Sequence, residues 1–322
     1  ACGGGGAATC RVAAPEVAMA EEIRLRANGL DFFALADGPE RGPLVLLLHG
    51  FPEHSRSWRH QLPALAAAGF RAVAPDQRGY GRSGRAGPYD LRTLSADAAG
   101  LVRALGRDRA TVVGHDWGGA VAWGAAMYEP DVVERLAVLN SPHPAVLAKE
   151  IATNPRQRAR SRYMLFFQIP WLPERLLSRN GGAGIARSLR GGSHVKDAFP
   201  DEELAHYREA FSSPDALAGP LGWYRAALRS QVPFLSRLPF LGTPRARRGG
   251  RSRPVRAPTL VLWGVHDRFL GEETIEPAKT ARYLEVGNVP TIVRVEEAGH
   301  FVQNEAPERV NAELLRWLRK PP

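Results

Sequence analysis

The residues best suited to chemistry lie in segment 114–119, which reads Gly-His-Asp-Trp-Gly-Gly. A β-branched run, Thr111 to Val113, precedes this segment, and small helix-compatible residues, 120–126, follow it. The pattern predicts a strand, a sharp turn and a helix, with glycines where a Cβ would not fit. This is the spacing of a nucleophile elbow, except that Asp116 replaces the usual serine or cysteine. A purely structural turn with a solvated aspartate would give the same pattern.

An aspartate at the reactive position favours one kind of reaction. A carboxylate can act as a nucleophile and form an ester with carbon. Attack on an amide or ester carbonyl would give a high-energy anhydride, whereas displacement at a saturated, activated carbon gives an ordinary ester. Asp116 is therefore suited to opening an epoxide or to displacing a halide.

Three other strand-like runs also lead to residues that could serve Asp116. These are 44–48 followed by Phe51, 259–263 followed by Asp267, and 291–295 followed by His300. Because active groups of open α/β sheets lie beyond the carboxyl ends of the strands, we expect all of them at one edge. The chain order Asp116, Asp267, His300 matches the order nucleophile, acid, base.

The elements that must position these residues follow an α/β pattern. Strand and helix signals alternate over 44–139 and return from Thr259, which predicts a mostly parallel central sheet with helices on both faces. Residues 22–36 alternate around Asn28-Gly29 and predict an antiparallel hairpin. Strand signals vanish over 145–240, where we expect a helical lid over the carboxyl edge of the sheet.

This pattern divides the chain into five parts. We expect an N-terminal extension without a fixed fold over 1–21 and a first core segment over 22–144. The helical lid follows over 145–240, then a basic linker over 241–257 and a second core segment over 258–322. Met19 is a candidate for the true start, since strand-like sequence follows it at once.

Composition excludes several classes of protein. The 322 residues are 44% hydrophobic and 24% charged, which is typical of a globular enzyme, and no apolar run is long enough to span a bilayer. The only cysteines, Cys2 and Cys10, lie in the tail, so a disulfide framework is excluded. Without a secretory signal in residues 1–18, we expect a cytoplasmic protein.

The net charge of +10 does not indicate a nucleic-acid partner. Segment 237–256 holds seven arginines and no acid, which leaves +3 for the rest of the chain. A segment rich in proline, glycine and arginine is more typical of a solvated loop than of a surface that binds nucleic acid. Metal-ligand spacings such as Cys-x-x-Cys and His-x-x-x-His are absent, so we expect no metal and no other cofactor.

Over roughly residues 22–320 the chain resembles the α/β-hydrolase superfamily and, within it, the soluble epoxide hydrolases. The motif at 114–119 resembles the nucleophile motif of that family, and His-Gly-Phe-Pro-Glu at 49–53 resembles its oxyanion loop. Asp-Gln-Arg-Gly-Tyr-Gly-Arg-Ser at 76–83 is similar to a further family signature. The lid stretches 163–170 and 219–225 resemble the two that supply a pair of lid tyrosines. The arginine-rich stretch 241–256 is longer and more basic than this resemblance leads us to expect.

The resemblance implies roles for particular residues. Asp116 would be the nucleophile, His300 the base and Asp267 its acid partner, while Tyr163 and Tyr224 would donate protons. The backbone N–H groups of Phe51 and Trp117 would form the oxyanion hole. Some relatives place the acid after the strand that here ends at Asn140, but Asn140 is an amide, which favours Asp267. The resemblance implies no cofactor, and the partners would be a small lipophilic epoxide and water. The epoxide is expected to be lipophilic because aromatic residues of the lid should line an apolar pocket: Phe166, Phe167, Trp171, Phe199 and Trp223.

Two other functions fit parts of the pattern. A haloalkane dehalogenase would use the same Asp116, Asp267 and His300, but a departing halide needs no proton, and relatives of that kind carry a polar amide where Phe51 stands. Dehalogenases of the fluoroacetate type carry arginine after the nucleophile, where this chain has Trp117. A non-catalytic small-molecule receptor on the same fold is the alternative of another class. The oligomeric state is not indicated by any pattern.

Overall fold

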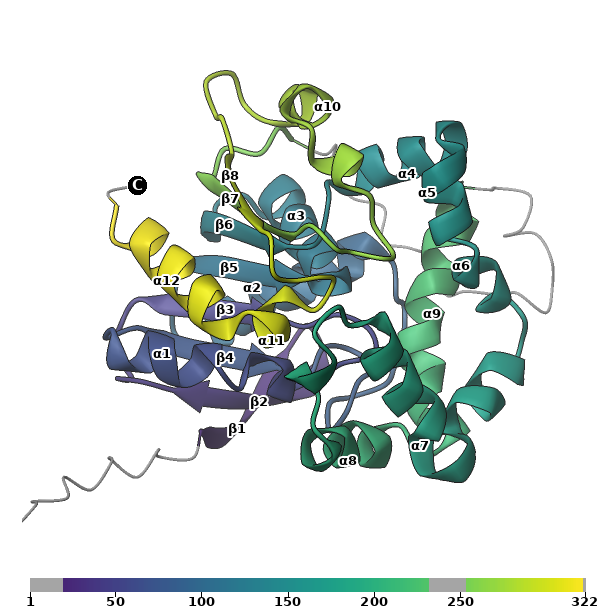
Figure 1. The fold of residues 1–322 in the computed structure, drawn as a ribbon. Coiled ribbons are helices and arrows are strands. Elements are labelled where there is room, and N and C mark those ends of the chain that lie inside the picture. Colours follow the sequence, from purple (N-terminus) through teal and green to yellow (C-terminus); the bar gives the residue numbers. More distant parts are fainter. Residues whose placement is uncertain (1–19, 232–252, 321–322) are drawn as a thin grey trace, which may run out of the picture.

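A single eight-stranded sheet forms the centre of the molecule in the computed structural model, which describes residues 20–231 and 253–320 (Figure 1). The spatial order of the strands is β1-β2-β4-β3-β5-β6-β7-β8. Their bounds are β1 Glu21–Ala27, β2 Leu30–Asp37, β3 Leu44–Leu48, β4 Arg71–Pro75, β5 Ala110–His115, β6 Val133–Leu139, β7 Thr259–Gly264 and β8 Thr291–Val295. The predicted fold class, a mostly parallel α/β sheet, is confirmed.

The sheet is antiparallel only at one edge. β2 pairs antiparallel with β1 and with β4, and the remaining neighbours from β4 to β8 are parallel. Asn28 and Gly29 connect β1 to β2 with φ values of 46° and 77°, the left-handed conformations that a two-residue hairpin turn requires. The predicted hairpin is therefore present, and β1 begins one residue before the core boundary expected at 22.

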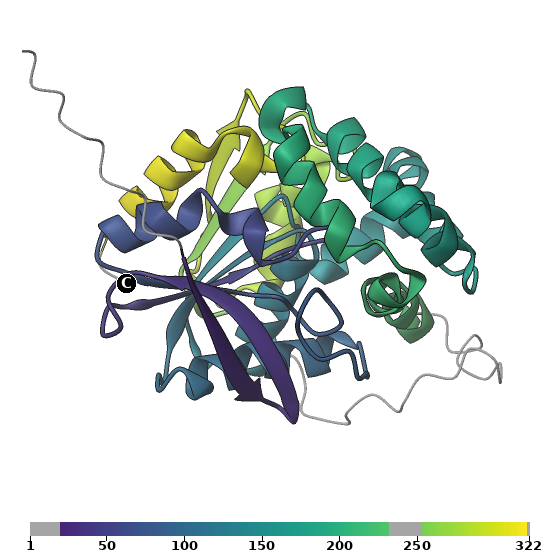
Figure 2. The same ribbon diagram turned by 90° about the horizontal axis from the view of Figure 1, so that it is seen from below.

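Helices cover both faces of the sheet (Figure 2). The helices α2 (Leu91–Ala104) and α3 (Trp117–Tyr128) pack on one face. The other face carries α1 (Gln61–Ala67), α11 (Val302–Glu305) and α12 (Pro307–Leu318). Short helical turns connect the core elements: η1 (Ser55–Trp58), η5 (Glu272–Ile275), α10 (Pro277–Thr280) and η6 (Ala281–Tyr283).

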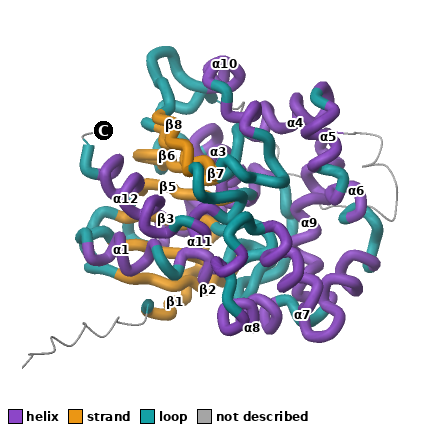
Figure 3. Tube along the Cα trace, viewed as in Figure 1, coloured by secondary structure: helices purple, strands orange, loops and turns teal. Residues whose placement is uncertain are grey.

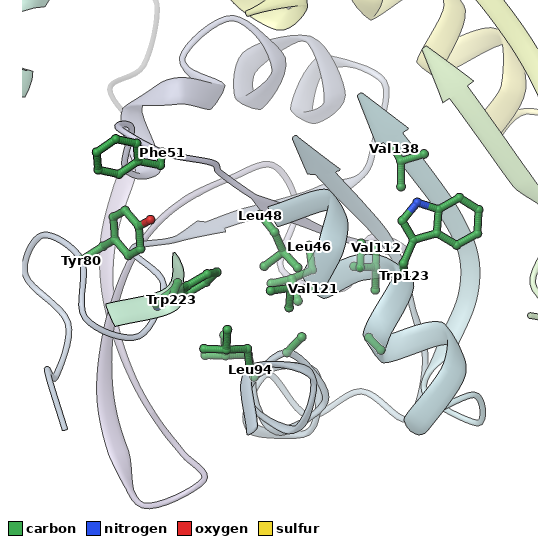
Figure 4. Packing of buried hydrophobic residues seen from close by; sticks show 14 of the residues in the cluster. Leu46, Leu48, Phe51, Tyr80, Leu94, Val112, Val121, Trp123, Val138 and Trp223 are labelled. Carbon is green, nitrogen blue, oxygen red and sulfur yellow. The ribbon is translucent and has the colours of Figure 1, made fainter. Parts of the chain in front are cut away.

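The central strands are buried on both sides because both faces are covered. Every residue of β3 and of β5 is buried, as their continuous apolar runs predict. Figure 4 shows how Leu46 and Val112 of the sheet meet Val121 of α3 and Leu94 of α2. This packing holds the carboxyl ends of the strands in fixed relative positions.

A helical segment enters between β6 and β7 and lies beyond the carboxyl ends of the parallel strands (Figures 1 and 3). We call it the helical insertion, residues 144–231. It comprises α4 Pro144–Thr153, α5 Pro155–Arg160, α6 Tyr163–Phe166, α7 Leu172–Gly192, η2 Lys196–Ala198, α8 Asp201–Ala210 and α9 Pro214–Gln231. The last part of the lid expected at 145–240 and most of the expected basic linker lie outside the described residues, as does the extension over 1–19.

Several helix boundaries differ from the sequence-based expectations. The sequence from Trp58 to Ala68 predicts one helix, but the structure forms two short pieces there, η1 and α1. The sequence over 161–168 predicts another helix, of which only the single turn of α6 forms. Within the helical lid expected over 145–240, no pattern marks α7 as a separate helix, and its interior Asn180, Gly181 and Gly182 have positive φ. These residues interrupt the helical periodicity that a sequence-based prediction depends on.

Candidate active site

Asp116 occupies a strained turn between β5 and α3. Its φ and ψ are 51° and −118°, a conformation that few residues with a Cβ adopt and that costs about 1–3 kcal/mol. The surrounding contacts impose this conformation: the Asp116 N–H donates to the carbonyl of Leu139 at 3.3 Å, and the Ser141 hydroxyl donates to the Asp116 carbonyl at 2.7 Å. The carboxylate is 14% exposed, so it reaches the space beyond the strand ends.

The loop after β3 approaches Asp116 very closely. A Cβ on Gly50 would lie 2.4 Å from the Asp116 Cβ, so only glycine fits there. This approach brings the Phe51 N–H to 3.0 Å from Oδ1 of Asp116, to which it donates. The Trp117 N–H belongs to the first residue of α3, and N–H groups at a helix start have no acceptor within the helix. Of the two predicted oxyanion-hole donors, the Phe51 N–H thus lies next to the Asp116 carboxylate in space, and Trp117 follows Asp116 directly in the chain.

His300 and Asp267 meet behind this carboxylate. Nδ1 of His300 lies 2.8 Å from Oδ2 of Asp267, and Nε2 of His300 lies 3.6 Å from Oδ2 of Asp116. His300 follows β8 and Asp267 follows β7, so the carboxyl ends of two strands supply the pair. The structure brings together the three residues that the sequence nominates.

Four donors fix the Asp267 carboxylate. Oδ1 accepts the N–H groups of Phe269 at 2.7 Å and Leu270 at 2.9 Å, and Oδ2 accepts the amide of Asn140 at 2.8 Å in addition to Nδ1 of His300. Burial alone would raise the pKa of Asp267, but His300, Asn140 and the backbone donors hold it below its usual range. Asp267 is therefore a fixed negative charge next to the imidazole.

The charge of His300 responds to both carboxylates. Burial lowers the pKa of His300, but the adjoining Asp267 and then Asp116 overcome this effect and raise the pKa to about 9. At neutral pH, with both carboxylates ionised, His300 is protonated. Any change that neutralises Asp116 lowers the pKa of His300.

A buried polar network lies under the backbone of His300. Nε2 of His115 donates to the His300 carbonyl at 2.8 Å, while Nδ1 of His115 lies 2.9 Å from Oε2 of Glu53. The Glu53 carboxylate also accepts from Ser57 at 2.8 Å and from Asn304 at 2.9 Å. Burial would raise the pKa of Glu53, but these donors hold it below its usual range. The network joins the loop after β3 to the loop that carries His300.

Tyr163 and Tyr224 of the helical insertion lie together over this edge of the sheet. Their ring centroids are 6.0 Å apart, and Tyr224 packs edge-on against Trp117 at 5.0 Å and Phe51 at 5.5 Å. Burial, followed by the charge of Asp116, raises the pKa of Tyr163, and burial raises that of Tyr224 well above its usual range. Both phenols therefore keep their protons and can act as donors.

The aromatic residues expected to line a pocket differ in their surroundings. Phe167 packs against Phe51 at 5.5 Å between ring centroids, close to the candidate site. Trp171 is 69% exposed, and Phe199 packs against Phe301 and Tyr207. For Trp171 the expectation was wrong, because amphipathic spacing does not distinguish a surface aromatic from one that lines a pocket. For Phe199, whose partner Phe301 packs against His300 at 5.0 Å, it stays a prediction.

Over residues 20–231 and 253–320 the structure contains no group of three or more His, Cys, Asp or Glu side chains placed to hold a metal ion. Within the same ranges no helix is both long and apolar enough to cross a membrane.

Comparison with known proteins identifies the family. The model of the alpha/beta hydrolase fold matches residues 43–307. The chain is 36% identical over 295 residues to the AB hydrolase superfamily protein YfhM of Bacillus subtilis, covering 91% of this chain and 96% of that protein. It is 35% identical over 312 residues to epoxide hydrolase 4 of Mus musculus, covering 92% and 79% of the two chains. The solved structure of epoxide hydrolase A from Mycobacterium thermoresistibile superposes with a TM-score of 0.74 at 32% identity, covering 93% and 98%.

The chain belongs to the epoxide hydrolase family of the α/β-hydrolases.

Sequence reasoning missed two polar residues of this hydrolase site. It rejected Asn140 as the acid but did not anticipate that the Asn140 amide holds Asp267. It gave no role to His115, which contacts the backbone of a residue 185 positions away. Asn140 follows a strand end and His115 adjoins the nucleophile motif, so position was the only available signal.

Proposed function

We propose that this hydrolase opens lipophilic epoxides to vicinal diols through an ester on Asp116. The observation that carries the proposal is the placement of a carboxylate at the elbow, with the His300–Asp267 pair 3.6 Å behind it and two protonated phenols on the insertion. The substrate would be apolar because Phe51, Phe167 and Trp117 surround the phenols. The partners are then a small epoxide and water.

The first step is alkylation of Asp116. A carboxylate oxygen attacks one epoxide carbon from the side opposite the ring oxygen, and the C–O bond of the ring breaks. Negative charge grows on the departing oxygen, so a proton donor must face it. Tyr163 and Tyr224 donate there, and the product is a hydroxyalkyl ester of Asp116 with one phenol deprotonated.

The second step is hydrolysis of that ester. His300 first gives its proton to the phenolate, which restores the phenol and leaves the imidazole neutral. The neutral imidazole then removes a proton from water, and the resulting hydroxide attacks the carboxyl carbon of Asp116. The N–H groups of Phe51 and Trp117 stabilise the tetrahedral oxyanion, as preorganised donors do in other acyl transfers. The intermediate expels the diol, whose departing oxygen takes the proton of the added hydroxyl. Asp116 is then a carboxylate and His300 is protonated, as at the start, and the sum is epoxide plus water giving diol.

The pKa of His300 supports this order of events. While Asp116 is ionised, His300 is held protonated with a pKa of about 9 and cannot accept a proton from water at neutral pH. Ester formation removes the negative charge that lies 3.6 Å from Nε2. The pKa of His300 then falls, so the base becomes available only after the ester exists.

The experiment is product analysis with aryl and alkyl epoxides and with haloalkanes. The parent is compared with Asp116→Ala and with the double variant Tyr163→Phe/Tyr224→Phe. Diol formation that is lost in Asp116→Ala and strongly reduced without the phenols is the expected result. Halide release that is indifferent to both tyrosines would reverse the assignment in favour of a dehalogenase, and binding without turnover would favour a receptor. A cytoplasmic location stays a prediction.

A further inference from the structure

Glu305, the last residue of α11, accepts four backbone N–H groups with one carboxylate. The residue is 7% exposed, and it forms no ion pair with any other described residue. Buried polar groups are as a rule hydrogen-bonded. For Glu305 four backbone N–H groups from two separate segments supply these bonds.

Two of the four donors flank His300. The Gly299 N–H donates to Oε2 of Glu305 at 2.9 Å, and the Phe301 N–H donates to Oε1 at 3.0 Å. The carbonyl of His300 itself accepts from His115 at 2.8 Å. The backbone is thus held immediately before, at and immediately after His300, which fixes the Cα from which the imidazole projects.

The other two donors come from the helical insertion. The N–H groups of His194 and Val195 donate to Oε2 of Glu305 at 2.9 Å and 3.0 Å. The insertion also lies close to the His300 loop, because a Cβ on Gly299 would be 3.0 Å from the Cβ of His194. One carboxylate therefore joins the loop of the base to the segment between α7 and η2.

We propose that Glu305 is a positioning residue for His300, and that it acts on hydrolysis of the Asp116 ester and not on its formation. The inference rests on the proposed function. Its reason is geometric: Nε2 of His300 must face the ester carbonyl through one water, and Asp267 holds only the far side of the ring. A displacement of about 1 Å in such a group can reduce a rate about 10²-fold. Formation of the ester uses Asp116 and the phenols, none of which bonds to Glu305.

The variant Glu305→Gln tests this role with almost no change of volume. An amide has one oxygen that accepts and one nitrogen that donates. Because Gly299 and Phe301 bond to different oxygens of Glu305, either orientation of the amide leaves one flank of His300 facing an N–H donor. Glu313→Gln is the matched control, since Glu313 is 8% exposed on α12 and pairs with Arg309 and Arg316 but not with the His300 loop.

The experiment is a single turnover of an aryl epoxide, with acid quench and mass spectrometry of the intact protein. The rise of the ester adduct gives the alkylation rate, and its decay gives the hydrolysis rate. We expect Glu305→Gln to alkylate at the parental rate and to hydrolyse the ester about 10²-fold more slowly, so that the adduct accumulates. Glu313→Gln should match the parent in both steps.

Several results would overturn the inference. If Glu305→Gln hydrolyses the ester at the parental rate, the hydrogen bonds of Glu305 do not position His300 for hydrolysis. If alkylation and hydrolysis slow equally, Glu305 has a general structural role. If Glu305→Gln does not fold, Glu305→Asp carries the same test, because its shorter side chain keeps the charge but cannot span both flanks. If the parent itself forms no diol, the proposed function fails, whereas diol formation in the parent with ester decay that is unaffected in the variant refutes only the role of Glu305.

Discussion

His300 carries a charge that depends on its neighbours and not on burial alone. Burial lowers its pKa, while Asp267 and Asp116 raise it to about 9. Asp267 stays ionised throughout the proposed cycle, but Asp116 becomes a neutral ester midway. The imidazole of His300 is therefore protonated while Asp116 is a free carboxylate. Once Asp116 is esterified, the same imidazole can act as a base toward water.

The pH dependence of ester hydrolysis follows from this change. His300 accepts a proton only when it is unprotonated, so the hydrolysis rate should rise with pH. It should level off with a midpoint below 9, because the ester lacks the Asp116 charge that helps to raise the pKa of the free enzyme to about 9. Decay of the ester adduct, followed at a series of pH values, measures the midpoint. A midpoint at or above 9, or a rate that does not change with pH, would contradict this account.

The two phenols should affect the other half of the reaction. Removing one hydroxyl leaves the second donor in place, so Tyr163→Phe and Tyr224→Phe should each slow alkylation about 10-fold, and the double variant about 10³-fold. Hydrolysis of any ester that forms should be nearly unchanged. The rise of the adduct in a single turnover checks this, with Tyr207→Phe as a control because Tyr207 is fully buried and packs against His54. A normal alkylation rate in the double variant would exclude the phenols as donors.

At the scale of elements, the position of the Asp116 carboxylate depends on how closely two loops approach each other. The turn after β5 presents Asp116, and the loop after β3 passes so near that Gly50 has no room for a side chain. That approach is what places the Phe51 N–H on the carboxylate. The position of the Asp116 carboxylate is therefore set by two strands and not by its own turn alone.

Gly50→Ala should disturb this arrangement. The new Cβ would lie 2.4 Å from the Cβ of Asp116, and relief of the clash should cost about 1–3 kcal/mol of the free energy of unfolding. Diol formation should fall about 10²-fold, because Asp116 and the Phe51 N–H separate. Gly191→Ala in α7 is the control, since its Cβ would meet nothing within 4 Å. Denaturant unfolding and steady-state rates of the two variants measure both effects, and equal behaviour would contradict the steric argument.

Elements whose structure follows from their own local sequence could be predicted, and those that depend on distant contacts could not. β3 and β5 are buried on both faces, so each is a continuous apolar run that local reading identifies. α7 contains a left-handed interruption at 180–182, and α6 is one turn, so neither has enough periodicity to be recognised. Asp116, Asp267 and His300 follow strands and motifs, whereas Asn140 and His115 act through partners far away in the chain, which no local pattern records. Glu305 joins nearby N–H groups, those of Gly299 and Phe301, to the distant N–H of His194.

At the scale of the whole molecule, polar contacts tie the helical insertion to the core at several places. Glu203 of α8 pairs with Arg56 of η1 at 2.8 Å, and the indole of Trp223 donates to the carbonyl of Arg78 at 3.0 Å. Glu305 receives the N–H groups of His194 and Val195. These contacts involve the loops after β3, β4 and β8, so the insertion is joined to two of the loops that carry the candidate site, those of Phe51 and His300.

Gln157 of α5 joins the helical insertion to the loop that carries Asp267. Its side chain is fully buried, donates from Nε2 to the Phe269 carbonyl at 2.9 Å and accepts the Gly271 N–H at Oε1 at 2.8 Å. Gln157→Leu keeps the volume and leaves a buried donor and a buried acceptor without partners, which should lower the free energy of unfolding by about 1–3 kcal/mol. Hydrogen exchange over 267–271 should become faster, and hydrolysis of the ester slower, because the Phe269 and Leu270 N–H groups that fix Asp267 lie in that loop. Hydrogen exchange over 267–271, monitored by mass spectrometry, measures the change in the loop. Arg187→Ala is the control variant, because Arg187 of α7 is exposed. Parental exchange in the loop of Gln157→Leu would mean that the core alone holds Asp267, and that the insertion contributes only its tyrosines to the site.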